Sequence, residues 1–221
     1  MRYRVGPFSC AGTSEPSSAC ETIPGVTEGT GRMEAFSDGI FAIAATLLVL
    51  EFAVGSGRDL GHELLHIWPS YLAYATSFIT IGIIWINHHH TVSLLARADR
   101  TMLFVNNLLL LTIAFLPFPT KLVADYLRKD GEEAATLAYT ATFVIMAVMH
   151  QVWWQYARHN RRLIADVVPD SALRAVDRAY APGVPMYAVC FVVAFFSPLA
   201  AVFLTFAIAA FYLPSAALFD R

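Results

Sequence analysis

Six long apolar stretches constrain what this chain can fold into more than any other feature of its sequence. Each has 18 to 24 residues with few charges, and they occupy residues 33–54, 67–90, 101–122, 135–157, 179–196 and 199–217. A helix needs about 20 such residues to cross the hydrocarbon core of a bilayer. The whole chain is 57% hydrophobic and only 14% charged, whereas soluble domains carry about 25% charged residues. We therefore predict an all-α membrane protein with six transmembrane helices per subunit.

The segments outside these stretches divide the chain. Residues 1–31 are rich in Gly, Ser, Thr, Pro and Glu and lack the apolar run of a signal peptide, so we predict a disordered N-terminal tail. An alternative is that the natural chain begins near Met33. Residues 32–217 form the predicted transmembrane domain, and residues 218–221 form a short C-terminal end. Because proline cannot continue a helix, Ser197 and Pro198 predict a tight helical hairpin between the last two stretches.

The distribution of basic residues predicts the orientation. With the N-terminus in the cytoplasm, the cytoplasmic segments hold 11 of the 15 Lys and Arg residues and the opposite segments hold 4. Such an excess is typical of cytoplasmic loops. We predict a multi-pass protein of the cell membrane with both termini in the cytoplasm, and we expect Trp153, Trp154 and Tyr156 to lie at the membrane interface. No continuous basic patch is present, so the expected partner is the lipid bilayer and not nucleic acid.

The first stretch differs from the others because it holds three acidic residues, Glu34, Asp38 and Glu51. Ionisable residues inside a membrane are costly and often functional. At 100° per residue, an apolar face with a single hydroxyl covers an arc of about 100° on this helix. The residues of this face are Gly39, Ile43, Thr46, Leu47, Leu50 and Val54. Asp38 points about 140° away from Ile43, so the carboxylate and the apolar face have different surroundings.

Polar side chains on the second and third stretches are expected at the membrane depth of Asp38. They are Trp85, Asn87, His88, His89, Asn106 and Asn107. A buried carboxylate needs hydrogen-bond donors, so we predict a polar cluster that joins three helices near the inner leaflet. Such a cluster can serve as packing contacts between helices, as an anchor for a gating helix, or as an ion-binding site. The sequence leaves these three interpretations open.

The run of three histidines at residues 88–90 raises the question of a metal site. Adjacent residues point 100° apart on a helix, so these imidazoles cannot all bind one ion, and we expect no metal and no other cofactor. The three cysteines show no metal-ligand spacing. The sequence also lacks hydrolase motifs and phosphate-binding loops. We therefore do not expect an enzyme, although an intramembrane metal enzyme is an alternative use of the histidines.

Three motifs resemble those of a known family. Residues 32–50 read RMEAFSDGIFAIAATLLVL, residues 85–89 read WINHH, and residues 107–120 read NLLLLTIAFLPFPT. They are similar to the first, second and third helices of the family of transmembrane protein 175, the endosomal and lysosomal potassium channel. The resemblance extends over residues 31–217.

The resemblance implies a homotetramer in which the first helix of each six-helix subunit lines a central pore permeable to K⁺. It implies that Ile43 forms a hydrophobic constriction, that Thr46 forms a hydroxyl layer, and that Leu47 and Leu50 form further apolar layers. It also implies a structural polar network, which consists of Arg32, Phe36, Ser37, Asp38, Asn87, His88, His89 and Asn107.

A channel of this kind differs from ordinary potassium channels, because the sequence lacks their TVGYG filter. Apolar rings can gate a pore by dewetting, and Glu51 near the outer mouth is expected to raise the local cation concentration. The alternative function is a secondary transporter of a small solute or ion. Its best support is that Pro117 and Pro119 can break the third stretch, because transporters often use broken helices.

Overall fold

The regular structure of the chain is helical throughout the described part. The computed structural model describes residues 30–52 and 60–218. The helices are α1 (Thr30–Leu47), η1 (Leu48–Glu51), α2 (Leu60–His66), α3 (Trp68–Ser93), α4 (Arg100–Phe115), α5 (Pro117–Tyr126), α6 (Glu132–Arg158), η2 (His159–Arg161), α7 (Asp170–Tyr180), α8 (Gly183–Ala194) and α9 (Pro198–Leu218). Most of the predicted tail, residues 1–29, lies outside the described residues, as do residues 219–221.

The described residues contain fewer membrane-spanning segments than the six predicted, so that prediction is corrected. Within the described residues, four helical segments are long and apolar enough to cross a bilayer: Thr30–Leu50, Trp68–Ser93, Arg100–Tyr126 and Glu132–Arg161. The predicted fifth span corresponds mainly to α8, whose 12 residues extend about 18 Å and do not cross a core of about 30 Å. The predicted sixth span contributes a shorter apolar segment, Pro198–Tyr212.

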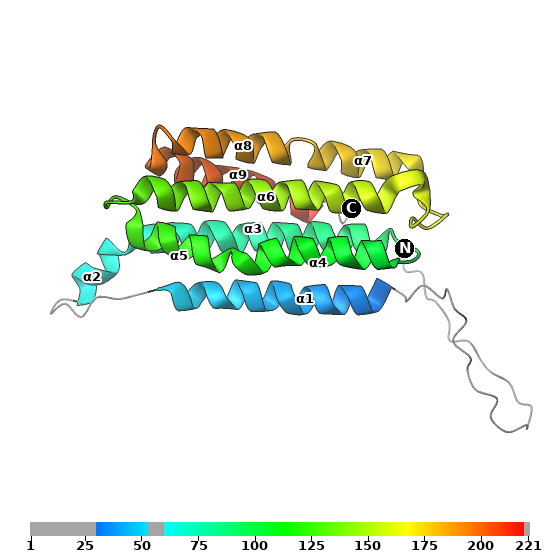
Figure 1. Cartoon of the computed structure of the whole chain (residues 1–221), viewed down its shortest axis with the longest axis horizontal. Coiled ribbons are helices and arrows are strands. Elements are labelled where there is room, and N and C mark those ends of the chain that lie inside the picture. The colour runs from blue at the N-terminus through cyan, green and yellow to red at the C-terminus, as the bar shows by residue number, and fades with distance from the viewer. Residues whose placement is uncertain (1–29, 53–59, 219–221) are drawn as a thin grey trace, which may run out of the picture.

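Apart from α2, which slants away at one end, the labelled helices are arranged along one common axis (Figure 1). The first helix, α1, lies at an outer edge of the bundle against α3 and α4. The longest helix, α6, occupies the middle and contacts α4, α5, α8 and α9. α7 and α8 follow each other along α6, and α9 packs beside α8. This arrangement leaves α1 as a single helix on one side of a much thicker bundle.

Local chemistry explains several helix boundaries. Asp99 caps α4, because its Oδ1 accepts a hydrogen bond from the backbone amide of Met102 at 2.7 Å. Gly131 precedes α6 with a φ of 95°, a left-handed conformation that favours glycine. α8 ends at Ala194 and α9 begins at Pro198, and the two helices pack together. The predicted helical hairpin is therefore confirmed.

Asp99 also joins the α3–α4 connection to the end of α6. Its carboxylate accepts a hydrogen bond from the Tyr156 hydroxyl, at 3.0 and 2.9 Å from the two oxygens, and Arg162 Nη2 lies 3.4 Å from Oδ2. Burial pushes the pKa of Asp99 upward. The hydrogen bonds from Met102 and Tyr156 and the charge of Arg162 outweigh burial and hold the pKa below its ordinary value of 3.8. This end of the bundle is therefore held by an ionised carboxylate.

Two tryptophans predicted at the membrane interface lie inside the bundle instead. Trp153 and Trp154 are fully buried. A buried indole needs an acceptor for its N–H group, and both have one: Trp153 Nε1 donates to Asn106 Oδ1 at 3.0 Å, and Trp154 Nε1 donates to Asp177 Oδ1 at 2.8 Å. The interface prediction for these two residues is wrong, because polar acceptors on α4 and α7 stabilise them inside the subunit.

Candidate functional site

The first helix has one face inside the subunit and one face outside it. The buried face of α1 and η1 consists of Met33, Ser37, Phe41, Ala44 and Leu48, at the spacing of three and four residues that defines one side of a helix. It packs on α3 and α4. The opposite face holds the predicted apolar stripe. A helix with a large apolar face outside its own subunit requires either lipid or another subunit to cover it.

The stripe of Ile43, Thr46, Leu47 and Leu50 is exposed on the single subunit. Ile43 is 60% exposed and Leu50 is 72% exposed, and Thr46 is exposed as well. The helix tightens to a 3-10 helix at Leu48, in which side chains three residues apart lie one above the other. This tightening brings Leu50 closer in line with Leu47 than an α-helical wheel predicts. Val54, the last predicted member of the face, lies outside the described residues.

A buried polar network fastens the inner face of α1 to the bundle. The Asn106 amide on α4 donates to Ser37 Oγ on α1 at 3.0 Å, and Ser37 Oγ donates to the Met33 carbonyl at 2.8 Å. Asn106 Oδ1 accepts from Trp153 Nε1 on α6 at 3.0 Å and lies 2.9 Å from His88 Nε2 on α3. Because the indole can only donate, the Asn106 oxygen is the shared acceptor and His88 Nε2 carries a proton. One amide therefore joins four helices.

The asparagine in this network is Asn106, whereas the polar cluster predicted from the sequence held both Asn106 and Asn107, and the network implied by the family resemblance named Asn107. Asn106 is buried and Asn107 is exposed on the outer side of α4. Adjacent residues of a helix point about 100° apart, so only one of the pair can face α1. The membrane depth of both asparagines could be predicted from the sequence. The direction in which each side chain points depends on how α4 is rotated against α1.

The acidic residues of α1 contact α3 on a second, more exposed side. Asp38 Oδ1 accepts a hydrogen bond from Trp85 Nε1 at 2.8 Å, and Glu34 Oε1 lies 2.8 Å from His89 Nδ1. Asp38 and Trp85 also line an apolar groove between α1 and α3. The predicted neighbours of Asp38 therefore include Trp85, while His88 belongs to the buried network around Asn106.

The remaining predicted residues of the polar network are Arg32, Phe36 and Asn87. Arg32 and Phe36 are exposed on α1, with Phe36 at 55%. The backbone carbonyl of Asn87 accepts from the Tyr180 hydroxyl at 3.1 Å, and Asn87 also lines a cavity on the far side of α3. Glu51 ends η1, and its side chain lies outside the described residues.

One residue of the network, Trp153, was not predicted to belong to it. The signal available in the sequence was an indole inside a long apolar stretch, which needs a hydrogen-bond acceptor if it is buried. An asparagine at a similar depth on another helix can supply that acceptor. The sequence showed both residues, but the pairing follows from the packing of α4 against α6.

Together these features define a class of protein: a helical membrane protein whose first helix is fastened by buried polar residues on one face and presents an apolar stripe on the other. A sequence model of the family described as "Endosomal/lysosomal potassium channel TMEM175" matches residues 32–117, the region that contains this helix and its polar partners. With the similarity of the relatives described next, we conclude that the chain belongs to the TMEM175 family.

The relatives are similar over most of the chain. The chain is 42% identical over 173 residues to "Potassium channel Cha6605_3372" of Chamaesiphon minutus, and this aligned region covers 76% of the chain and 85% of that protein. It is 41% identical over 172 residues to "Potassium channel B446_29190" of Streptomyces collinus, covering 76% and 84%. The crystal structure of a lysosomal potassium-selective channel TMEM175 homolog from Chamaesiphon minutus superposes with a TM-score of 0.77 at 38% identity, covering 85% of this chain and 97% of the other.

Proposed function

We propose that this chain is a subunit of a potassium-permeable cation channel of the cell membrane, in which the exposed stripe of α1 lines the pore. The observation that carries the proposal is the division of α1 into a buried face, which Ser37 anchors to Asn106, and an exposed apolar face. Relatives similar over most of the chain are named potassium channels. Permeation of K⁺ through this chain follows as the function that agrees with both observations.

A single exposed helix cannot enclose water, so the proposal requires several copies of the chain. Four copies around a common axis, each turning Ile43, Leu47 and Leu50 inward, would form successive apolar rings. From Ile43 to Leu50 the rings extend about 10 Å along the axis. Such rings close a pore by dewetting, because a cation that loses part of its hydration shell finds no replacement ligands there.

Thr46 supplies the polar element of the stripe. Its hydroxyl donates a hydrogen bond to the Ile43 carbonyl at 2.9 Å. The proton is used within the helix, so the oxygen lone pairs are available to a cation. In a tetramer, a ring of four such oxygens would offer ligands to a partly dehydrated K⁺ between the apolar rings. Glu51 would raise the cation concentration at the outer mouth.

The buried network around Asn106 gives the stripe its direction. Ser37 lies about 120° from Ile43 around the helix, so the hydrogen bond between Asn106 and Ser37 fixes the rotation of α1 about its own axis. We propose that this network positions the pore helix and that ions do not bind in it. The remaining interactions, Asp38 with Trp85 and Glu34 with His89, would hold the same helix against sideways displacement.

The orientation and the crossings form part of the same proposal. The Arg-rich connections, the N-terminal end of α1 and the predicted C-terminus are placed in the cytoplasm, as the excess of basic residues predicts. Four helical segments of the described residues are long and apolar enough to make the crossings, and an even number of crossings agrees with both termini on one side.

The transporter alternative depends on a third span broken at Pro117 and Pro119. Leu116, which separates α4 from α5, keeps helical dihedral angles, and its amide donates to the Ile113 carbonyl at 3.1 Å. The prolines therefore leave a nearly continuous helix without an unwound segment whose carbonyls can bind an ion. This geometry favours the channel over the transporter.

The test is the K⁺ permeability of an Ile43 variant in liposomes. Replacing Ile43 with Asn wets the narrowest proposed ring, because a carboxamide supplies hydrogen bonds that the isoleucine does not. We expect Ile43→Asn to raise the K⁺ flux at least tenfold, equivalent to about 1.4 kcal/mol of the barrier. The flux is measured with a K⁺-sensitive dye at equal protein density.

The matched control is Val49→Asn. Val49 is 52% exposed on the same segment but lies about 120° from Ile43 on the wheel, so we expect its flux to remain at the level of the unmodified chain. Equal increases in K⁺ flux in both variants would contradict the assignment of Ile43 to the constriction. The mass of the detergent-solubilised assembly, measured by light scattering, tests the tetramer separately.

A further inference from the structure

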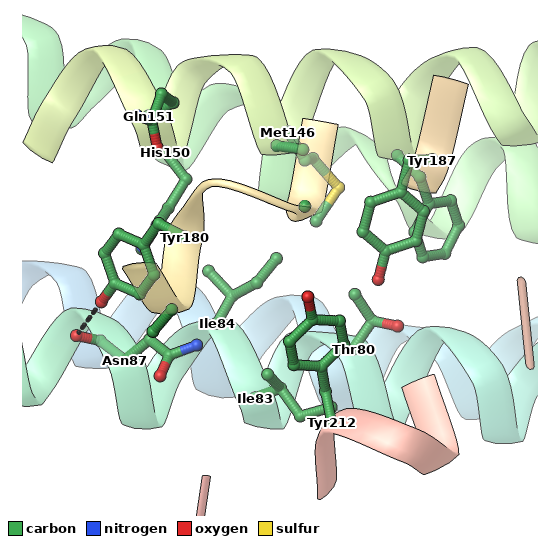
Figure 2. Close-up of a pocket in the computed structure, with 14 residues that line it drawn as sticks. Thr80, Ile83, Ile84, Asn87, Met146, His150, Gln151, Tyr180, Tyr187 and Tyr212 are labelled. Carbon is green, nitrogen blue, oxygen red and sulfur yellow. Dashed lines mark hydrogen bonds between the residues drawn. The ribbon is translucent and has the colours of Figure 1, made fainter. Parts of the chain in front are cut away.

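The histidines of this chain differ in whether solvent reaches them. Inside the bundle, His150 is buried against the ring of Tyr180 (Figure 2), and His88 is buried as well. By contrast, His62 and His66 lie on the short helix α2, and both are exposed. α2 lies outside the four described segments that are long enough to span a bilayer, and it slants away from the bundle (Figure 1). These two imidazoles are therefore accessible to ligands from solution.

The spacing and the distance between the two imidazoles suit a shared ligand. Residues four apart lie on the same side of a helix, one turn above the other. Nε2 of His66 lies 3.0 Å from Nε2 of His62, whereas the ring centroids are 4.2 Å apart. The nitrogens are closer together than the ring centres, so the two Nε2 atoms face each other across one turn of α2.

Without an ion, the same two nitrogens form a hydrogen bond. One imidazole donates from Nε2 and the other accepts, and the tautomer of each ring decides which one donates. When both rings carry their proton on Nδ1, both Nε2 lone pairs are available to a metal ion. A hydrogen bond between exposed side chains competes with water and contributes little. It therefore presents only a small obstacle to an ion that binds both nitrogens.

The distance between the nitrogens favours one kind of metal. Imidazole nitrogens lie about 2.0–2.1 Å from a bound first-row divalent ion. At that bond length, two nitrogens 3.0 Å apart form an angle of about 95° at the ion. This angle is close to the value of about 90° in a square-planar Cu²⁺ or Ni²⁺ site, whereas tetrahedral zinc would need nitrogens about 3.3 Å apart. Of these ions, Cu²⁺ binds most tightly to nitrogen ligands.

We propose that His62 and His66 form a two-histidine binding site for Cu²⁺, with water in the remaining coordination positions. Among the residues that the structure describes, no group of three or more His, Cys, Asp or Glu side chains is placed to hold a metal. Two protein ligands bind an ion reversibly, unlike the four ligands of a structural site. The ion would link consecutive turns of a seven-residue helix that is too short to be stable by itself. The site is independent of the proposed pore, because no residue of the apolar stripe takes part in it.

The experiment measures Cu²⁺ binding by electron paramagnetic resonance, with the full chain purified in detergent without a histidine tag. At one Cu²⁺ per chain, we expect a single square-planar copper signal whose spin-echo modulation shows two bound imidazoles. Zn²⁺ should displace the copper only at an excess of roughly a hundredfold or more. A spectrum with one imidazole would overturn the two-histidine site, and displacement by an equal amount of Zn²⁺ would overturn the choice of copper.

A variant of unchanged composition distinguishes this site from scattered binding to exposed histidines. Leu64→His combined with His66→Leu leaves two histidines on α2 but places them about 200° apart around the helix. Leu64 is 38% exposed, so the fold tolerates the exchange. We expect the two-imidazole signal to disappear and the Cu²⁺ affinity, measured by competition with glycine, to fall roughly tenfold or more, because the second ligand no longer binds within the same turn.

The matched control is His159→Gln, which removes an exposed histidine outside α2. We expect its Cu²⁺ affinity and its two-imidazole signal to equal those of the unmodified chain. An unchanged affinity in the exchanged variant, or an equal fall in His159→Gln, would show that copper binds without the pair of His62 and His66. Either result would contradict the proposal.

Discussion

Two buried histidines in the same bundle differ in their hydrogen bonding. His88 on α3 is fully buried and lies 2.9 Å from Asn106 Oδ1 through its Nε2. His150 on α6 is nearly as buried, yet neither of its nitrogens has a partner among the described residues. Trp153 contacts both rings, with centroid distances of 5.2 Å to His88 and 6.5 Å to His150. One indole therefore lies between a histidine that is hydrogen-bonded to Asn106 through Nε2 and a histidine that has no hydrogen bond among the described residues.

The comparison separates two uses of polar residues inside a membrane protein. Around Asn106, one amide forms hydrogen bonds that join four helices and specify one rotation of α1, although Nδ1 of His88 has no partner among the described residues. Both ring nitrogens of His150 are buried and have no partner among the described residues. The first histidine belongs to a network that holds the helices together, whereas the second contributes no hydrogen bond among the described residues. Substitutions in the two regions should therefore differ in their effect on the stability of the fold.

The largest effect is expected for Asn106→Leu. The side chain keeps nearly the same volume, but His88 Nε2 and Trp153 Nε1 lose their acceptor and remain buried. Two orphaned donors cost about 3 kcal/mol together. We expect a large fall in the midpoint of thermal unfolding in detergent and a low yield of the oligomer. The control is Asn107→Leu, whose exposed position predicts a change within about 0.5 kcal/mol. Equal losses would contradict the assignment of the network to Asn106.

A smaller effect is expected for His88→Phe. The substitution preserves the ring contacts with Phe41 and Trp153 but removes one hydrogen bond to Asn106. The acceptor still has Trp153 Nε1 as a partner, so we expect a loss of about 1 kcal/mol. The thermal midpoint should lie between those of Asn106→Leu and the unmodified chain. A midpoint as low as that of Asn106→Leu would mean that His88, and not Asn106, is the centre of the network.

The third prediction concerns Asp99, whose carboxylate is satisfied but partly exposed. Its pKa is held below 3.8 in the folded chain, so its contribution to stability is complete above about pH 4 and is lost as the pH falls through the lower folded value. Asp99→Asn should lower the thermal midpoint at pH 6, and the difference between variant and unmodified chain should shrink as the pH falls toward 3. A difference that is independent of pH would show that the charge of Asp99 contributes nothing.

Much of this arrangement was readable from the sequence, for physical reasons. Apolar length predicts membrane-spanning helices directly, and the wheel of α1 separated Ile43, Thr46 and Leu50 from Asp38 because helical periodicity is local. The resemblance of residues 32–50 to the TMEM175 family is supported by the match to the family. The pore-lining role of the stripe stays a prediction.

Other features depend on packing between helices and could not be predicted from the sequence. The choice of Asn106 over Asn107 depends on the rotation of α4, and the burial of Trp153 depends on the acceptor that α4 supplies. α8 begins only after Pro182, so the predicted stretch 179–196 includes the end of α7 as well as α8. The cavity lined by Asn87 and His150 arises from four elements that are far apart in the sequence.

The smallest effect on stability is expected for His150→Phe. Because no hydrogen bond to the described protein is lost and the phenyl ring can keep the contacts with Trp153 and Tyr180, the thermal midpoint should change by less than the equivalent of about 0.5 kcal/mol. The measurement is made beside His88→Phe, in the same detergent. A loss as large as that of His88→Phe would mean that His150 is hydrogen-bonded within the protein. The two histidines would then have the same role, and the contrast between them would fail.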